Sequence, residues 1–169
     1  MPLIAVGWLF TLGVLAHNAE EVVYLPAWEA LYWPPAWIAR TTRWHKVPGD
    51  KEFRFAVIVF SVALISITAV TSVTGAGSPA AYLLAGYALA MVINGLIPHI
   101  VATVAMRRYM PGTATAVLLN LPLGCLFLIR ALSENYIQLR LFAWSGPLVA
   151  LSMLASLPIL FAVGKRLCP

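Results

Sequence analysis

The segment Leu3–Tyr24, with the sequence LIAVGWLFTLGVLAHNAEEVVY, decides the fold of this chain. Its uncharged part, residues 3–16, would form only about 21 Å of α-helix, which is too short for a hydrocarbon core of about 30 Å. A helix that crosses a membrane here must therefore continue through His17, Glu20 and Glu21. One imidazole and two carboxylates then lie within the membrane boundary, where charge is costly and by default indicates a function.

The composition and the apolar runs predict a membrane protein. Hydrophobic residues make up 62% of the 169 residues and charged residues only 10%, whereas an average soluble protein has about a quarter charged residues. The apolar runs are continuous and lack the period-two alternation of outer-membrane barrel strands. We therefore expect an all-α fold, one bundle of five transmembrane helices in the lipid bilayer without a separate soluble domain. The expected spans are 3–24, 53–73, 80–106, 114–132 and 142–163.

The segment between the first two spans, residues 26–52, combines aromatic and basic side chains. Indole and phenol rings favour the half-hydrated headgroup layer of a membrane. We expect residues 28–43 to lie at this interface, with Pro34-Pro35 ending any helix there. The segment would either anchor the bundle or give a lipid-like substrate access to a site. Its aromatic and basic residues are Trp28, Tyr32, Trp33, Trp37, Trp44, Arg40, Arg43, Lys46 and Lys51.

The distribution of basic residues predicts the orientation of the helices. An outside N-terminus puts nine of the 11 basic residues on the cytoplasmic side and leaves only Arg130 and Arg140 outside, which is the bias of inner-membrane proteins. The net charge of +5 is then explained by topology and anionic lipid, with no reason to invoke nucleic acid. The nine are Arg40, Arg43, Lys46, Lys51, Arg54, Arg107, Arg108, Lys165 and Arg166.

The N-terminal helix is expected to be retained, because Met1-Pro2-Leu3 lacks the positive charge with which a cleaved signal peptide begins.

The side chains of the first span share one helix face. At about 100° per residue, Glu20 and Glu21 project to opposite sides of His17 by about 60° and about 40°. The third span ends on the same side of the membrane, so His99 should lie at a similar depth. Mixed nitrogen and oxygen ligands suit zinc, iron or manganese. We expect His17, His99 and one or both glutamates to hold a divalent transition metal, with the glutamates and Asn94 as the catalytic candidates.

Pro98 supports a cavity in the third span. It cannot donate a hydrogen bond to the carbonyl group of Asn94, four residues earlier. Free backbone carbonyls at membrane depth are tolerated where they line a cavity or are buried in protein. The alternative is an ordinary proline kink with a packed Asn94 side chain.

Three further residues are candidates for substrate binding. Arg107 and Arg108 follow the third span, and guanidinium groups bind phosphate oxygens in pairs. Asn120 lies in the inner half of the fourth span and would either face the cavity or pack. His45, in the basic loop, is on the correct side to be a further metal ligand, although a loop histidine is more often solvated.

Three motifs in this order resemble a known family. The run His17-Asn18-Ala19-Glu20-Glu21 resembles the motif that names the HXXEE family of small bacterial integral membrane proteins, whose members are uncharacterised. Residues 94–99 resemble the central Asn/His element of that family, and Pro111-Gly112 with Thr113 or Thr115 resembles its Pro-Gly element. The resemblance implies that these positions form one site, in a multi-pass protein of the bacterial inner membrane, but it implies no reaction.

The favoured hypothesis is an intramembrane metalloenzyme that acts on a lipid or isoprenoid-like molecule. Hydrolysis by a metal-activated water is the simplest chemistry, and oxidation by non-haem iron would use similar ligands. A protonated glutamic acid in an isomerase or cyclase, with aromatic faces stabilising a carbocation, needs no metal. A proton- or cation-coupled transporter, completed by a homo-oligomer, uses the same residue types. A structural ion-pair network between the acids and Arg107 or Arg108 is the alternative without a function.

Overall fold

The computed structural model describes residues 1–32 and 49–167. Over these residues the chain contains helices and no strand, as the sequence predicts. Five helical segments are long and apolar enough to cross a membrane, and they indicate a multi-pass membrane protein. The candidate ligand His45 and the Pro34-Pro35 break lie outside the described residues, as do Trp33, Trp37, Arg40, Arg43, Trp44 and Lys46.

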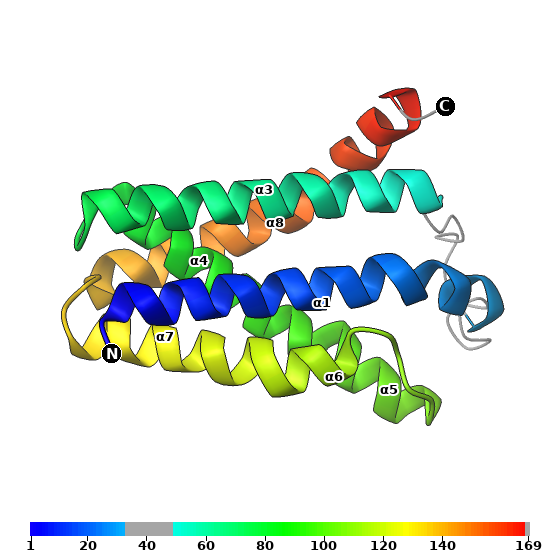
Figure 1. Ribbon diagram of the computed structural model, residues 1–169, viewed down its shortest axis with the longest axis horizontal. Helices are drawn as coiled ribbons and strands as arrows, with labels where there is room; N and C mark the ends of the chain where they lie inside the picture. The colour runs from blue at the N-terminus through cyan, green and yellow to red at the C-terminus, as the bar shows by residue number, and fades with distance from the viewer. Residues whose placement is uncertain (33–48, 168–169) are drawn as a thin grey trace.

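The five segments run antiparallel to their neighbours in the sequence (Figure 1). The first two are α1 (Leu3–Tyr32) and α3 (Asp50–Thr74). The third combines α4 (Pro79–Asn94), the π-helix η1 (Gly95–Ile100) and α5 (Val101–Met106). The fourth combines α6 (Thr113–Thr115), the π-helix η2 (Ala116–Asn120) and α7 (Leu121–Ser133), and the fifth is α8 (Leu139–Leu167).

The first helix is longer than the sequence predicts. It continues without a break past Tyr24 and through Pro26 to Tyr32. A proline in a transmembrane helix removes one backbone hydrogen bond, but neighbouring helices compensate for it. This extension carries Trp28 and Tyr32 beyond the motif on the same helix, and it therefore determines which side chains surround the site.

The core lies between α1, α3, α4 and α7. Phe10 of α1 stacks on Phe127 of α7, with ring centroids 6.5 Å apart, and Leu64 of α3 and Leu84 of α4 are fully buried beside them. Helix α4 contributes mainly alanines to this core, so the neighbouring backbones approach closely, as is common in membranes. Its Gly86 meets Val149 of α8, where a β-carbon would lie 2.6 Å from the valine side chain.

Hydrogen bonds between side chains align α1 with α3. The Trp8 indole donates to Ser72 at 3.0 Å, the Thr11 and Thr68 hydroxyl groups are 2.8 Å apart, and Asn18 donates to Ser61 at 2.8 Å. Small hydroxyl and amide groups of this kind join helices within lipid. Because Asn18 follows His17 directly, the last of these contacts fixes the rotation of α1 at the motif.

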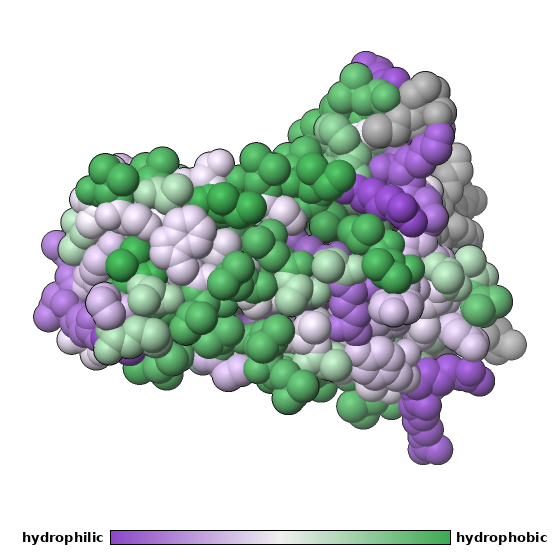
Figure 2. All heavy atoms as spheres, in the orientation of Figure 1, coloured by the Kyte–Doolittle hydropathy of each residue, from purple (hydrophilic) through white to green (hydrophobic). Residues whose placement is uncertain are grey.

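The surface has the distribution that a bilayer requires. Figure 2 shows hydrophobic side chains over most of the middle of one face, with hydrophilic side chains gathered towards its two ends. Between Arg140 and Lys165, the large exposed side chains of α8 are apolar, and include Leu148, Leu151, Leu154 and Ile159. This face therefore fits a hydrocarbon environment.

The third span breaks at the predicted proline. Pro98 lies inside η1, and the backbone of Ile97 leaves helical geometry at φ −130° and ψ 112°. The Ile97–Pro98 peptide bond is cis. The break separates α4 from α5 and places His99 on the buried side of the bend.

A candidate metal centre between the first and third spans

His17, Glu21 and His99 form one cluster. Both imidazoles are fully buried, and the Glu21 side chain is 13% exposed. Glu21 Oε1 lies 2.9 Å from His99 Nε2 and 3.5 Å from His17 Nε2. The imidazole rings meet edge to face with centroids 4.8 Å apart. The structure thus brings together the two histidines that the sequence places at similar depth.

The cluster has the dimensions of a metal site. One potential ligand atom from each of the three residues lies within 4.8 Å of the other two. Two ligands at about 2.0–2.1 Å from one ion are separated by about 2.9 Å at a right angle and by about 3.4 Å at the tetrahedral angle. The two distances to Glu21 Oε1, 2.9 Å and 3.5 Å, therefore suit one ion bound by two imidazoles and a carboxylate.

The nitrogens of His99 are available for a ligand. Neither Nδ1 nor Nε2 has a hydrogen-bond partner among the described residues, although both atoms are buried. Nε2 lies 2.9 Å from Glu21 Oε1, within the range of an ion pair if the ring is protonated. Because buried polar atoms are normally paired, the two His99 nitrogens beside this carboxylate could serve as metal ligands.

The hydrogen bonds of His17 define its tautomer. Its Nδ1 lies 3.1 Å from the Gly112 carbonyl oxygen and 3.0 Å from the Thr115 hydroxyl. A carbonyl only accepts hydrogen bonds, so Nδ1 carries the proton, and Nε2 of the neutral ring keeps its lone pair. The Asn94 amide nitrogen, 3.4 Å from Nε2, faces that lone pair. A backbone carbonyl that accepts a hydrogen bond from the far ring nitrogen is typical of histidines that bind metals.

Gly112 makes room for both imidazoles. It precedes α6 with φ +90°, and a β-carbon there would lie 2.6 Å from His99 Cε1 and 3.0 Å from His17 Cε1. The left-handed backbone and the close approach of the rings each favour glycine. The Pro-Gly turn is therefore part of the site as well as a connection between spans.

Glu20 has different partners from Glu21. One of its oxygens accepts a hydrogen bond from the Tyr109 hydroxyl, and the other accepts one from the Thr115 hydroxyl at 2.8 Å. Burial raises the pKa of Tyr109, in the turn between the third and fourth spans, and the hydrogen bond to Glu20 raises it further. The two glutamates of the motif therefore have different surroundings: Glu21 belongs to the cluster, and Glu20 lies beside it.

Comparisons with known proteins identify the family. The family described as "Protein of unknown function with HXXEE motif" matches residues 8–127. The chain belongs to this family. It is also 32% identical over 165 residues to "Uncharacterized protein YrkK" of Bacillus subtilis (strain 168), covering 95% of this chain and 96% of that protein. No solved structure matches the chain.

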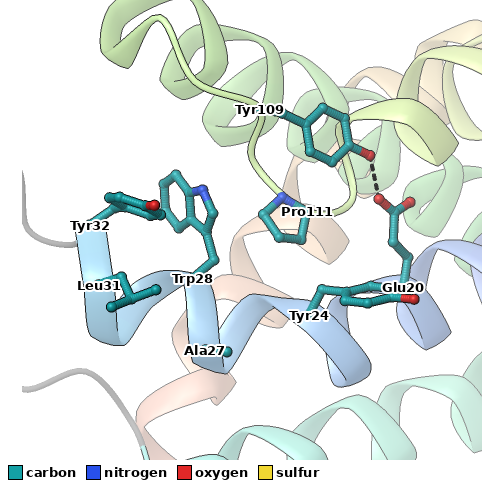
Figure 3. A pocket seen from close by; sticks show the side chains of 8 residues that line it. All are labelled: Glu20, Tyr24, Ala27, Trp28, Leu31, Tyr32, Tyr109 and Pro111. Atoms are coloured by element: carbon teal, nitrogen blue, oxygen red, sulfur yellow. Dashed lines mark hydrogen bonds between the residues drawn. The ribbon is translucent and has the colours of Figure 1, made fainter.

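A pocket opens beside the HXXEE motif. It has a volume of about 420 Å³ and lies between the second half of α1 and the turn after α5. Figure 3 shows the Glu20–Tyr109 pair at one end and the rings of Trp28 and Tyr32 at the other. The pocket is lined by Glu20, Tyr24, Ala27, Trp28, Leu31, Tyr32, Tyr109 and Pro111.

The other predicted site residues lie around the cluster. Asn94 reaches His17, as described above, whereas Asn120 is fully buried against Gly13, one turn before His17. Neither polar atom of the Asn120 side chain has a partner among the described residues. Arg107 is exposed at the end of α5, and the Arg108 guanidinium lies over the Tyr32 ring, 4.7 Å from its centroid. Their proposed roles in substrate binding stay predictions.

Sequence reasoning missed the aromatic pocket and Thr115 as a bridge. The pocket had a signal, because Glu20, Tyr24, Trp28 and Tyr32 recur every four residues and so lie along one side of a helix. That signal depends on a helix that continues past Pro26, which the sequence analysis did not predict. The contact between Thr115 and His17, which are 98 residues apart, had one signal, because Thr115 follows Pro111-Gly112 in the third motif that resembles the family.

Proposed function

We propose that this HXXEE protein is an intramembrane metal-dependent enzyme that acts on a lipid or isoprenoid-like substrate. The observation that carries the proposal is the buried cluster of His17, Glu21 and His99, with unpaired nitrogens on His99. A buried carboxylate between two imidazoles is costly unless a cation or a proton compensates for it. A divalent ion compensates for the carboxylate and uses the imidazole lone pairs at the same time.

The donor set suggests the metal and its chemistry. Two imidazoles and one carboxylate suit zinc in catalytic sites, and they also suit non-haem iron or manganese. Such an ion supplies Lewis acidity and lowers the pKa of a water molecule towards neutrality. Hydrolysis is the simplest reaction for this set, and we propose it ahead of oxidation.

The chain itself supplies positioning and proton transfer. His17, Glu21 and His99 hold the ion, and the hydrogen bond from Nδ1 to Gly112 orients His17. Glu20 is the remaining carboxylate, and it faces the pocket in which a substrate would lie. Its two oxygens accept hydrogen bonds from the Tyr109 and Thr115 hydroxyl groups, and as a carboxylate it can act as a general base.

The pocket suggests an amphiphilic substrate. Its aromatic and aliphatic walls extend from Glu20 to Tyr32, about 18 Å along the helix, and suit an acyl or isoprenoid chain. Arg108 borders the far end through its contact with the Tyr32 ring and is available to an anionic headgroup. We therefore propose that an anionic group of the substrate lies near Arg107 and Arg108, that its apolar chain follows the aromatic walls, and that the bond to be hydrolysed lies at the Glu20 end of the pocket.

We also propose that the N-terminus lies outside a bacterial inner membrane and the C-terminus in the cytoplasm. The ends of α1, α5 and α8 lie at the same end of the bundle, and the latter two carry Arg107-Arg108 and Lys165-Arg166. The opposite end carries Arg130 and Arg140. Basic residues favour the cytoplasmic side, so the site would open towards the inner leaflet.

The aromatic pocket favours a second function that needs no metal. Among the residues that the structure describes, Glu20 is the one carboxyl group that lines it, with Tyr24, Trp28 and Tyr109 around the same space. A protonated glutamic acid among aromatic faces could protonate an alkene or epoxide and stabilise the resulting carbocation. In this alternative, a membrane isomerase or cyclase, Glu21 and the histidines orient the site without a metal.

Metal analysis of the purified protein tests the proposal. We expect about one zinc, iron or manganese ion per chain in detergent or nanodiscs, lost in His17→Ala and in His99→Ala. The matched control is Glu29→Gln, because Glu29 is a partly buried acid of the same helix outside the cluster. Wild-type protein that stays free of metal after reconstitution with each of the three ions contradicts the metalloenzyme and leaves the metal-free alternative.

A further inference from the structure

Thr115 connects the pocket to the buried cluster. Its hydroxyl, on α6, lies 2.8 Å from Glu20 Oε2 and 3.0 Å from His17 Nδ1, both on α1. It also lies 3.1 Å from the carbonyl oxygen of Gly112. A single hydroxyl therefore bridges the carboxylate that lines the pocket and an imidazole of the cluster.

The direction of each hydrogen bond follows from the groups involved. His17 Nδ1 carries a proton, because it faces the Gly112 carbonyl, and it shares this one proton between that carbonyl oxygen and the Thr115 oxygen in a bifurcated hydrogen bond. An ionised carboxylate only accepts, so the Thr115 hydroxyl donates its one proton to Glu20. The result is an ordered chain from His17 through Thr115 to Glu20, with Tyr109 donating to the other carboxylate oxygen.

We propose that Thr115 is a positioning residue, through which Glu20 orients and polarises His17. A hydrogen bond to a charged group is stronger than one to a neutral group, and hydrogen bonds in a chain strengthen one another. The carboxylate thus increases the electron density of the imidazole without touching it. The first glutamate of the HXXEE motif then acts on the histidine through Thr115, while the second contacts that histidine directly.

This inference rests on the proposed function only where it treats His17 as a metal ligand. In that case a molecule in the pocket that forms a hydrogen bond with Glu20 weakens the hydrogen bond between Glu20 and Thr115. This in turn changes the electron density of the His17 imidazole. Pocket occupancy and metal affinity are then coupled in both directions. The hydrogen-bonded chain itself exists with or without a metal, so it can be tested on metal-free protein.

The rival explanation gives Thr115 no role in the site. The Gly112 carbonyl alone would hold His17 Nδ1, and Glu20 would act on the imidazole only through space. The two explanations differ in one respect, which is whether the effect of Glu20 on His17 requires the Thr115 hydroxyl. A double-mutant cycle isolates that dependence.

The experiment follows the Nδ1–H proton of His17 by NMR on ¹⁵N-histidine-labelled, metal-free protein in nanodiscs. The signal is assigned by its loss in His17→Gln. We expect a downfield, exchange-protected proton in wild type, an upfield shift in Thr115→Val and in Glu20→Gln, and no further shift when Glu20→Gln is added to Thr115→Val. An unshifted proton in Thr115→Val overturns the proposal, and so does an equal effect of Glu20→Gln in both backgrounds.

Two variants separate this role from a general effect on folding. Thr115→Ser retains the hydroxyl and should restore the wild-type shift. Thr113→Val removes a neighbouring hydroxyl, which contacts Thr103 and the His99 backbone carbonyl but neither Glu20 nor His17, and should leave the proton unmoved. A shift in Thr113→Val as large as that in Thr115→Val contradicts the specific role.

A Co²⁺ titration of the same proteins reports on the proposed function separately. If His17 is a ligand, Thr115→Val should weaken Co²⁺ binding by about 10–100-fold, as changes in second-shell partners do, and Thr115→Ser should bind as wild type. No Co²⁺ binding by wild type, together with the expected NMR cycle, would remove the metal site and keep the positioning role. Co²⁺ binding that is unchanged in Thr115→Val, with no shift of the proton, would keep the metal site and remove the positioning role.

Discussion

The two halves of α1 place their polar groups among different partners. In the first half, Thr11 contacts Thr68 and the Gly7 carbonyl, and Trp8 donates to Ser72. In the second half, Glu21 faces two imidazoles, and the nitrogens of His99 have no hydrogen-bond partner among the described residues. Polar groups that complete each other explain helix packing, whereas a charged group among incomplete partners indicates a ligand.

The largest expected effect comes from removing the charge of the second half. Glu21→Gln keeps the shape of the side chain but leaves a divalent cation among neutral ligands in a region of low dielectric constant. We expect Co²⁺ affinity to fall by more than the factor of about 100 that bounds typical second-shell effects. Isothermal titration measures it, with Glu29→Gln as the control. Equal losses in both variants would show that the acids of α1 act only through net charge.

The second prediction concerns the turn that touches both rings. Gly112→Ala forces a left-handed backbone, at about 1–2 kcal/mol, and places a methyl group 2.6 Å from His99. Gly77→Ala is a matched control, because Gly77 has φ +72° with nothing within 4 Å. We expect both variants to lose stability in denaturant titrations, and only Gly112→Ala to lose Co²⁺ binding as well. Similar Co²⁺ affinities in the two variants would contradict the contact between Gly112 and the imidazoles.

The sequence predicts the spans and the meeting of the histidines for a simple physical reason. Apolar length determines where helices cross a membrane. Because successive spans alternate in direction, the first and third spans run the same way, and this brings His17 and His99 to similar depth. Glu20 and Glu21 project at similar angles on either side of His17 around the helix axis, so the sequence leaves open which acid joins the cluster. The hydroxyls of Tyr109 and Thr115, which come from another part of the chain, bind Glu20 and leave Glu21 to the imidazoles.

Contacts distant in sequence also explain what the sequence did not predict. Pro111-Gly112 reads as an ordinary turn, and only the assembled bundle shows that both imidazole rings lie against it. The extension of α1 through Pro26 has the same origin, because neighbouring helices decide whether a proline ends a helix in a membrane. Where the sequence placed an interfacial segment, the structure continues α1 as the wall of a pocket.

The third prediction tests the paired half of α1. Thr68→Val removes a hydroxyl that bonds Thr11 and the Leu64 carbonyl, and should cost about 0.6–1.7 kcal/mol of stability, the range for polar contacts between membrane helices. Co²⁺ affinity should not change, because these groups bind only each other and the backbone. Unfolding in mixed micelles measures the first quantity and titration the second. A loss of Co²⁺ binding would show that the two halves of α1 are not independent.

The smallest expected effect is at the pocket rim, where Arg108 lies over the Tyr32 ring. Arg108→Gln should cost about 0.5–1 kcal/mol, as for an exposed cation–π contact, and the cost should vanish in a Tyr32→Leu background. Arg107→Gln, which alters the neighbouring exposed arginine, is the control for lost charge. If Arg108→Gln reduces binding to vesicles of anionic lipid more than Arg107→Gln does, Arg108 holds a headgroup in addition to fixing Tyr32. Equal reductions would instead assign the attraction to net charge alone, and the pocket would then select its ligand by the apolar chain.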